Sequence, residues 1–270
     1  MKFEKDDLKE VVRTRYNQIA QQSKEKNETS CCGSTDCCGE VDYTIFSDDY
    51  SELQGYNTDA DLGLGCGLPT EHAGLKKGDT VIDLGSGAGN DCFVARSIVG
   101  EEGMVWGLDF AVAMLTKARK NAKKLGLKNI SFVKGDIESM PFENELADVI
   151  ISNCVLNLVP DKNKAFSEIF RVLKTLGHFC VSDVVLEGKL PENIRKATEM
   201  YAGCVSGALQ KDEYLETIRG NGFTGIEIKK EKKINVPDEL LLQYISGEEL
   251  KTFRENKSGI FSITVTANKA

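Results

Sequence analysis

The stretch that most constrains the fold of this chain is Thr80–Asp91, which reads T-V-I-D-L-G-S-G-A-G-N-D. A short apolar run leads into Asp83, and three glycines then alternate at Gly85, Gly87 and Gly89. Apolar residues with helical spacing follow, so the stretch predicts a buried strand, a tight turn and the start of a helix. Glycine permits positive φ angles and close approach of a ligand to bare backbone, and the helix N-terminus offers unpaired N–H groups. We therefore expect a ligand to bind at this turn.

The glycine spacing distinguishes between classes of ligand. In the dinucleotide fingerprint G-x-G-x-x-G, the third glycine lies three positions after the second. Here the third glycine comes one residue earlier, and Asn90 occupies the expected position. With the acidic Asp83 before the turn, the pattern resembles the first motif of Rossmann-like class I methyltransferases, whose ligand S-adenosylmethionine is a cationic sulfonium amino acid without a pyrophosphate. A purely structural glycine turn and a nucleotide-binding enzyme are the alternatives.

Strands and helices alternate regularly after the glycine turn, which predicts an α/β fold with a mostly parallel, twisted sheet flanked by helices. Further strands are expected at residues 104–108, 130–133, 147–152 and 178–185. Helices are expected at residues 7–21, 111–125, 161–173, 191–205, 212–219 and 237–255. Residues 223–234 and 260–267 alternate in polarity, which predicts a closing antiparallel strand pair.

Three regions are expected along the chain. Residues 1–70 hold an N-terminal helix and a cysteine-rich segment, residues 71–190 form the cofactor-binding core, and residues 191–270 contribute helices and closing strands. The 270 residues and 41% apolar content fit one large domain with small additions. The net charge of −8 disfavours nucleic acid as the main partner and permits a monomer. Without a membrane-length apolar run or a signal-peptide pattern, we expect a cytoplasmic protein with no membrane partner.

Nine cysteines need an explanation, because disulfide frameworks are not favoured in the cytosol. Cys92 and Cys180 lie inside apolar stretches, where a cysteine behaves as a small buried apolar residue. The other cysteines are Cys31, Cys32, Cys37, Cys38, Cys66, Cys154 and Cys204. The first four form two vicinal pairs in a polar segment, and as a zinc site they lack the usual two-residue gap.

Three of these cysteines lie where chemistry is expected. Cys66 falls on an irregular loop, because flanking glycines and Pro69 disfavour regular structure. Cys154 directly follows the strand at residues 147–152, and ligands in open α/β sheets bind at the carboxyl ends of strands. Cys204 lies at the end of an expected helix with small residues on both sides. The residues alone leave open whether the three sulfurs converge.

The contexts of the cysteines resemble those of arsenite S-adenosylmethionine methyltransferases of the short bacterial or archaeal type. The matching segments are Cys31-Cys32, L-G-C-G-L-P around Cys66, D-L-G-S-G-A-G, S-N-C-V-L-N-L-V-P-D-K, Y-A-G-C-V-S-G-A-L around Cys204, and the ending S-I-T-V-T-A-N-K. The resemblance implies an enzyme that methylates arsenite, and then methylarsenite, for arsenic detoxification. It also implies that the thiolates of Cys66, Cys154 and Cys204 bind trivalent arsenic as the substrate, with no structural metal. The chemistry agrees, because soft ions prefer thiolate donors.

The resemblance also assigns roles in turnover and cofactor binding. Cys31 or Cys32 would form a transient disulfide with Cys66 as product leaves, and thioredoxin or glutathione would restore the thiols. The glycine turn would hold the methionine portion of the cofactor, Asp109 the ribose and Glu138 the adenine. The residues assigned to the cofactor are Asp83, Gly85, Ser86, Gly87, Gly89, Asp109, Phe110, Met114, Ile137, Glu138 and Asn153.

The chain departs from the family pattern in three places, none of which removes a thiol or a cofactor carboxylate. Leu68 stands where many relatives have Asn, Ala111-Val112 replaces Thr-Pro, and Thr175-Leu176 replaces the common Pro-Gly. We also expect the extra C-terminal domain of longer relatives to be absent.

Two other functions are compatible with parts of the pattern. A carbon or oxygen methyltransferase of a small molecule would keep the same fold, and a non-catalytic thiol protein could sequester a soft ion. The intact glycine turn argues against the second. The residues do not determine the number of methyl groups added, the acceptance of antimony, the N-terminal cysteine used or the oligomeric state.

Overall fold

The computed structural model describes residues 5–21, 48–188, 207–234, 238, 242, 245–255 and 258–270. The strands are β1 (Thr80–Leu84), β2 (Met104–Asp109), β3 (Ile130–Lys134), β4 (Ala147–Asn153), β5 (Leu173–Glu187), β6 (Thr224–Ile234) and β7 (Gly259–Asn268). The helices are α1 (Lys5–Ile19), α3 (Pro69–His72), α4 (Asn90–Val99), α5 (Val112–Lys124), α6 (Lys162–Val172), α9 (Lys211–Gly220) and α11 (Gly247–Glu255), with a 3₁₀ turn η2 (Leu156–Leu158). The two vicinal cysteine pairs, Cys204 and the helix expected at residues 191–205 lie outside the described residues.

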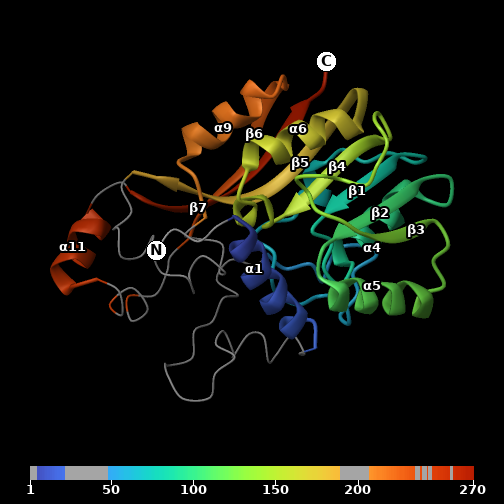
Figure 1. Ribbon diagram of the computed structural model, residues 1–270, viewed down its shortest axis with the longest axis horizontal. Coiled ribbons are helices and arrows are strands. Elements are labelled where there is room, and N and C mark those ends of the chain that lie inside the picture. The colour runs from blue at the N-terminus through green and yellow to red at the C-terminus, as the bar shows by residue number, and fades with distance from the viewer. Residues whose placement is uncertain are drawn as a thin grey trace.

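The seven strands form one sheet in the order β3-β2-β1-β4-β5-β7-β6 (Figure 1). Strands β1 to β5 are parallel, and β7 runs antiparallel between β5 and β6. The predicted parallel sheet with a closing antiparallel pair is therefore confirmed. Because β7 pairs with β5 from His178↔Asn268 to Glu187↔Gly259, the last strands extend the same sheet as the core.

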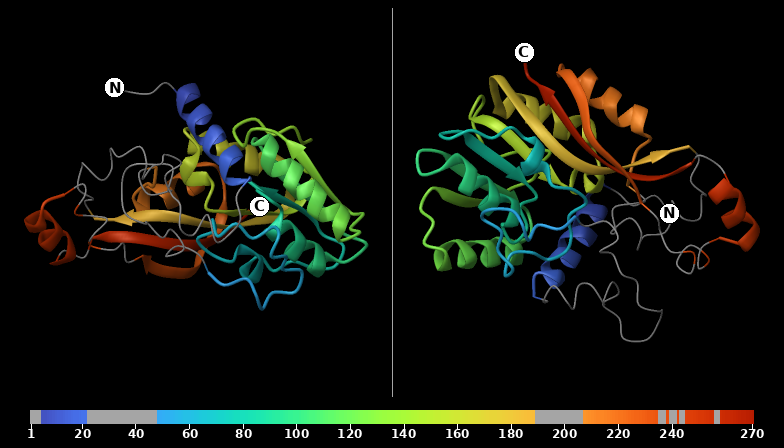
Figure 2. Two further views of the ribbon diagram at one scale, coloured as in Figure 1. Left: turned by 90° about the horizontal axis from the view of Figure 1, so that it is seen from below. Right: turned by 180° about the vertical axis from the view of Figure 1, so that it is seen from behind.

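Helices cover both faces of the sheet (Figure 2). Alternate residues of each strand pack on opposite faces, as the two-residue period of a strand requires. In β1, Val81 joins the buried cluster beneath α4 and α5, and Ile82 joins the cluster beneath α6 and α9. Helix α1 lies against α5, where Asn17 accepts a 3.0 Å hydrogen bond from the Ala113 N–H. Within the described segments, no helix combines the length and the apolar character that crossing a membrane requires.

Strand β5 begins earlier than predicted. Leu173 was expected to end a helix, yet it pairs with Ala147 and starts the strand. The next pair joins Val149 to His178, so β5 has extra residues at this point and bulges out of register. At the tip of the bulge, Leu176 is 83% exposed and has a φ angle of 67°. The apolar spacing at residues 166–173 indicates a helix face but does not show where the chain leaves the helix.

Candidate active site

A cavity of about 150 Å³ lies at the carboxyl ends of β1, β2 and β4. Its wall combines the glycine turn, the end of β2, residues 135–137, residues 153–155 and a face of α1. The predicted cofactor residues in this wall are Asp83, Gly85, Ser86, Gly87, Asp109, Phe110, Met114, Ile137 and Asn153. Gly89 and Glu138 are not part of the wall. The fold thus gathers residues that are up to 70 positions apart in the sequence around one ligand-sized space.

Each glycine of the turn serves a different purpose. All three have positive φ angles, 70° at Gly85, 51° at Gly87 and 98° at Gly89. A Cβ atom on Gly85 would lie 2.4 Å from a methyl group of Val155, so this position needs glycine for packing as well. At Gly89 a Cβ would meet the rings of Phe93 and Phe132, beneath the turn. At Gly87 a Cβ would meet nothing within 4 Å, so the turn is open to a ligand at this point.

The buried carboxylates of Asp83 and Asp109 and the partly buried carboxylate of Asp91 line the cavity. Burial, together with the neighbouring Asp91, raises the pKa of Asp83 well above its ordinary value. Burial raises the pKa values of Asp91 and Asp109 to about 6. Asp109 accepts hydrogen bonds from the N–H groups of Gly87 at 2.9 Å and Ala111 at 2.8 Å, which partly offset that effect. A cation in the cavity would lower the pKa of all three carboxylates and stabilise their ionised forms.

The residues present fit S-adenosylmethionine. The ligand carries a sulfonium and an ammonium cation, which match the carboxylates of Asp83, Asp91 and Asp109. The hydroxyl of Ser86 is buried in the cavity wall without a hydrogen-bond partner among the described residues. A buried polar group without a partner is unfavourable, so a ligand group that bonds to it would stabilise the site.

The wall also contains residues that sequence reasoning missed, among them Lys9 and Tyr16 of α1, Tyr50, and Asp91. Lys9 Nζ lies 2.6 Å from the Asp136 carboxylate and also contacts Glu138. The second Glu138 oxygen accepts a 2.7 Å hydrogen bond from the Asp161 N–H. The Glu138 carboxylate is therefore engaged with α1 and the start of α6. The amphipathic pattern of residues 7–21 predicted a packed helix, but no local signal indicated its partner.

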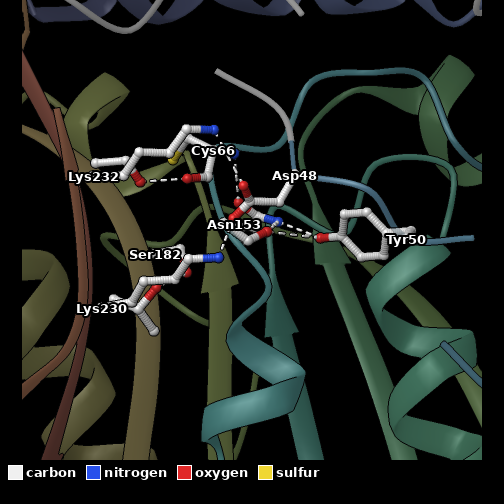
Figure 3. Close-up of polar contacts among 10 residues, drawn as sticks. Asp48, Tyr50, Cys66, Asn153, Ser182, Lys230 and Lys232 are labelled. Carbon is white, nitrogen blue, oxygen red and sulfur yellow. Dashed lines mark hydrogen bonds and ion pairs between the residues drawn. The ribbon is translucent and has the colours of Figure 1, made fainter. Parts of the chain in front are cut away.

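Cys66 and Cys154, at 1% and 4% exposure, lie on two loops that meet beside the cavity. Figure 3 shows Cys66 beside Asn153, the residue before Cys154. The Cys66 N–H donates a 3.0 Å hydrogen bond to Oδ1 of Asn153, the residue before Cys154. The Cys154 N–H donates at 2.8 Å to the Ser182 carbonyl, and Cys154 has a φ angle of 59°. This left-handed conformation is uncommon for a residue other than glycine and persists where surrounding contacts fix it. Cys154 belongs to the cavity wall, and so does Gly65, the residue before Cys66.

Tyr214 of α9 interacts electrostatically with both of these thiols. Burial and the adjacent Asp183 carboxylate raise the pKa of the Tyr214 hydroxyl well above its ordinary value, and the charges of Cys66 and Cys154 add to this rise. Both sulfurs are therefore within electrostatic reach of one phenol oxygen. The third sulfur of the expected set, Cys204, lies outside the described residues.

Cys92 and Cys180 are core residues, as the sequence indicated. Both have no measurable exposure, and burial raises both pKa values, that of Cys180 to about 12. The Cys92 thiol donates a 3.2 Å hydrogen bond to Asp83. Among the described residues, no three His, Cys, Asp or Glu side chains are arranged to hold a metal ion.

The strand order, the glycine turn and the acidic strand ends define a Rossmann-like class I methyltransferase that depends on S-adenosylmethionine. In agreement, the family described as "Methyltransferase domain" matches residues 75–222. The chain is 38% identical over 235 residues to the arsenite methyltransferase of Halobacterium salinarum and 31% identical over 243 residues to that of Aquipseudomonas alcaligenes. The chain belongs to the arsenite methyltransferase family.

These similarities cover different shares of each protein. They include 83% of this chain and 59% of the Halobacterium protein, and 87% of this chain and 68% of the Aquipseudomonas protein. A solved structure, an arsenic(III) S-adenosylmethionine methyltransferase from Chlamydomonas reinhardtii, superposes with a TM-score of 0.64 at 34% identity. That superposition covers 75% of this chain and 66% of the algal chain. This chain therefore spans about three fifths to two thirds of the length of these three relatives.

Proposed function

We propose that this protein transfers methyl groups from S-adenosylmethionine to arsenite, and then to methylarsenite, in arsenic detoxification. The observation that carries the proposal is the hydrogen bond between the Cys66 N–H and Asn153, which joins the two cysteine-bearing loops beside the cofactor cavity. Thiolates are the donors that a soft ion prefers, and the homologous proteins named above are arsenite methyltransferases.

In this proposal the chain positions two reactants. Cys66, Cys154 and Cys204 hold trivalent arsenic and leave its lone pair unshared. The glycine turn and Asp109 hold the cofactor, which supplies an electrophilic methyl group when bound. Because the methyl group is already activated, alignment of the two partners supplies most of the rate gain. No general base is needed for methyl transfer from such a donor.

Methyl transfer to the arsenic lone pair raises arsenic from the trivalent to the pentavalent state. In this proposal the thiols of Cys66 and of Cys31 or Cys32 return two electrons to arsenic and form a transient disulfide as the trivalent product leaves. Thioredoxin or glutathione then restores the thiols by exchange, and both reductants are available in the cytoplasm, where we place the enzyme. The proposed enzyme is a monomer.

The chain is held against β6 at Asp48, 16 positions after Cys32. Asp48 forms ion pairs there with Lys230 at 2.8 Å and Lys232 at 3.2 Å (Figure 3). The 15 residues between Cys32 and Asp48 can span up to about 50 Å when extended, and this length supports a contact of either cysteine with Cys66.

Transfer of a radiolabelled methyl group to arsenite, with a thiol reductant present, tests this function. We expect Cys154→Ser and Cys204→Ser to abolish or strongly reduce the first methylation, because serine is a hard donor. Cys180→Ala is the matched control, since its sulfur is buried in the core on β5. Undiminished transfer in both serine variants would contradict the three-thiolate site. Transfer only to organic acceptors would indicate a carbon or oxygen methyltransferase, and arsenite binding without transfer would indicate a sequestering protein.

A further inference from the structure

Tyr50 is a buried residue that the proposed mechanism does not use. Its side chain is 6% exposed and packs with Leu68 and Val94. Its hydroxyl oxygen lies 3.0 Å from each carboxylate oxygen of Asp91 and 3.2 Å from the Gly67 carbonyl oxygen. The same hydroxyl thus contacts a carboxylate of the cofactor cavity and the residue next to Cys66. Figure 3 shows the Tyr50 ring pointing toward Asn153.

Asn153 completes the connection between these groups. Its Oδ1 accepts the hydrogen bond from the Cys66 N–H at 3.0 Å, and its Nδ2 donates to the Gly67 carbonyl at 2.8 Å. The same Nδ2 lies 3.2 Å from Asp91 and also contacts the Tyr50 hydroxyl oxygen. One side-chain amide therefore holds the backbone on both sides of the Cys66 α-carbon.

The Cys66 loop has little room to adopt another position. A Cβ on Gly65 would lie 2.7 Å from Asn153 Nδ2, and a Cβ on Gly67 would lie 2.5 Å from the Ser182 hydroxyl. The Cys66 carbonyl accepts a hydrogen bond from Ser262 on β7. Closely packed interiors transmit strain, so a change at Asn153 acts on the Cys66 loop as well.

We propose that Tyr50 is a positioning residue that ties the Cys66 loop to Asp91, so that occupancy of the cofactor cavity determines how firmly the Cys66 thiol is held. A cation bound at Asp91 changes how that carboxylate shares its hydrogen bonds with Tyr50 and Asn153. Coupling between two sites is reciprocal, so a fixed Cys66 loop also favours cofactor binding. The meaning of this coupling for turnover rests on the proposed role of Cys66 as an arsenic ligand.

The test measures the alkylation rate of Cys66 by iodoacetamide, quantified on its peptide by mass spectrometry. The native protein and Tyr50→Phe are compared with and without S-adenosylmethionine, and phenylalanine keeps the buried ring in place. Loss of a buried hydrogen bond to a charged group shifts a local equilibrium by roughly tenfold, so we expect Cys66 in Tyr50→Phe to react roughly tenfold faster. We expect the cofactor to slow alkylation in the native protein and to have a smaller effect in the variant.

Two controls separate positioning from general loosening. Cys180 in the same samples reports on the core, and its rate should be equal in both proteins. Tyr56→Phe removes another carboxylate-bound hydroxyl, 2.9 Å from Asp61, while Asp61 keeps its bond to the Gly63 N–H. We expect this variant to leave the Cys66 rate near the native value.

Three results would overturn the proposal. They are an unchanged Cys66 rate in Tyr50→Phe, equal protection by the cofactor in both proteins, and a parallel rise at Cys180. The assay contains no arsenic, so these results are independent of the arsenite methylation assay. A protein that fails to methylate arsenite could still show the coupling, and the reverse also holds.

Discussion

The Tyr214 hydroxyl of α9 donates a 3.1 Å hydrogen bond to the Asp183 carboxylate of β5, and both side chains are fully buried. Asp183 follows Ser182, whose carbonyl binds the Cys154 N–H. Lys162 donates to two carbonyls of the loop after Cys154, at 3.0 and 3.1 Å, and its charge also acts on Asp183. The buried polar network of Tyr214, Asp183 and Lys162 therefore contacts the segments on both sides of Cys154 and holds its turn in place.

This network makes stability depend on pH. Burial raises the pKa of Asp183 from 3.8 to about 7, so the folded protein retains this proton more strongly than the unfolded chain does. The stabilisation is complete below about pH 4 and is lost as the pH rises to about 7, by up to about 1.4 kcal/mol per pH unit. Asp91 and Asp109, with pKa values of about 6, act in the same sense. Urea denaturation of the cofactor-free protein at a series of pH values should show that the unfolding free energy falls as the pH rises.

The substitution Asp183→Asn separates the contribution of Asp183 to this pH dependence from those of Asp91 and Asp109. The amide stays neutral at all these pH values, so the unfolding free energy should fall less steeply between about pH 5 and pH 7. The pKa of ion-paired acids such as Asp148 is lowered, here by bonds to Lys174 and Thr80. Such acids reduce the unfolding free energy as the pH falls, and they do so only near or below pH 4. An equal slope in the native protein and Asp183→Asn would contradict the prediction.

Cofactor binding should depend on pH in a related way. Because a cation favours ionised carboxylates, affinity for S-adenosylmethionine should rise as the pH passes through about 6, by up to roughly tenfold per pH unit for each coupled proton. S-Adenosylhomocysteine lacks the sulfonium charge, so its affinity should change less. Isothermal titration calorimetry of both ligands in two buffers measures the affinities and the protons released. Equal pH slopes for the two ligands would show that the buried carboxylates do not respond to the sulfonium charge.

The glycine turn offers a matched pair of substitutions. In Gly85→Ala the new Cβ collides with Val155, so we expect a loss of stability of about 1–3 kcal/mol with weakened cofactor binding. In Gly87→Ala the Cβ enters open space in the cavity wall, so we expect a smaller loss, about 1 kcal/mol from the positive φ angle, and weak cofactor binding. Urea denaturation and calorimetry distinguish the two effects. Equal losses of stability in the two variants would show that the contact with Val155 is unimportant.

The sequence predicted most of what depends on local pattern. The glycine turn, Asp109 at the end of β2 and the position of Cys154 after β4 follow from strand periodicity and from the rule that ligands bind at strand ends. Contacts between distant segments have no such signal. Lys9 reaches residues 136–138 and Tyr50 reaches Asp91 only after the sheet has brought these segments together.

The cysteines show the same limit. Apolar neighbours correctly placed Cys92 and Cys180 in the core, because burial follows from local hydrophobicity. The meeting of the Cys66 and Cys154 loops depends on Asn153 and on the packing of glycines, which no local periodicity encodes. Only the resemblance to arsenite methyltransferases suggested that these two thiols act together.

Leu176 should be a point where the chain can be stabilised. It has a φ angle of 67° and is 83% exposed. The left-handed conformation costs a residue with a Cβ about 1–2 kcal/mol, and glycine avoids most of this cost. We expect Leu176→Gly to raise the unfolding free energy by about 1 kcal/mol, measured by urea denaturation, because no buried contact is lost. Leu125→Gly is the control, since Leu125 is also exposed but has a φ angle of −81°, and here we expect destabilisation by about 0.5–1 kcal/mol. Equal changes in the unfolding free energy of both variants would mean that the positive φ angle at Leu176 carries no conformational cost.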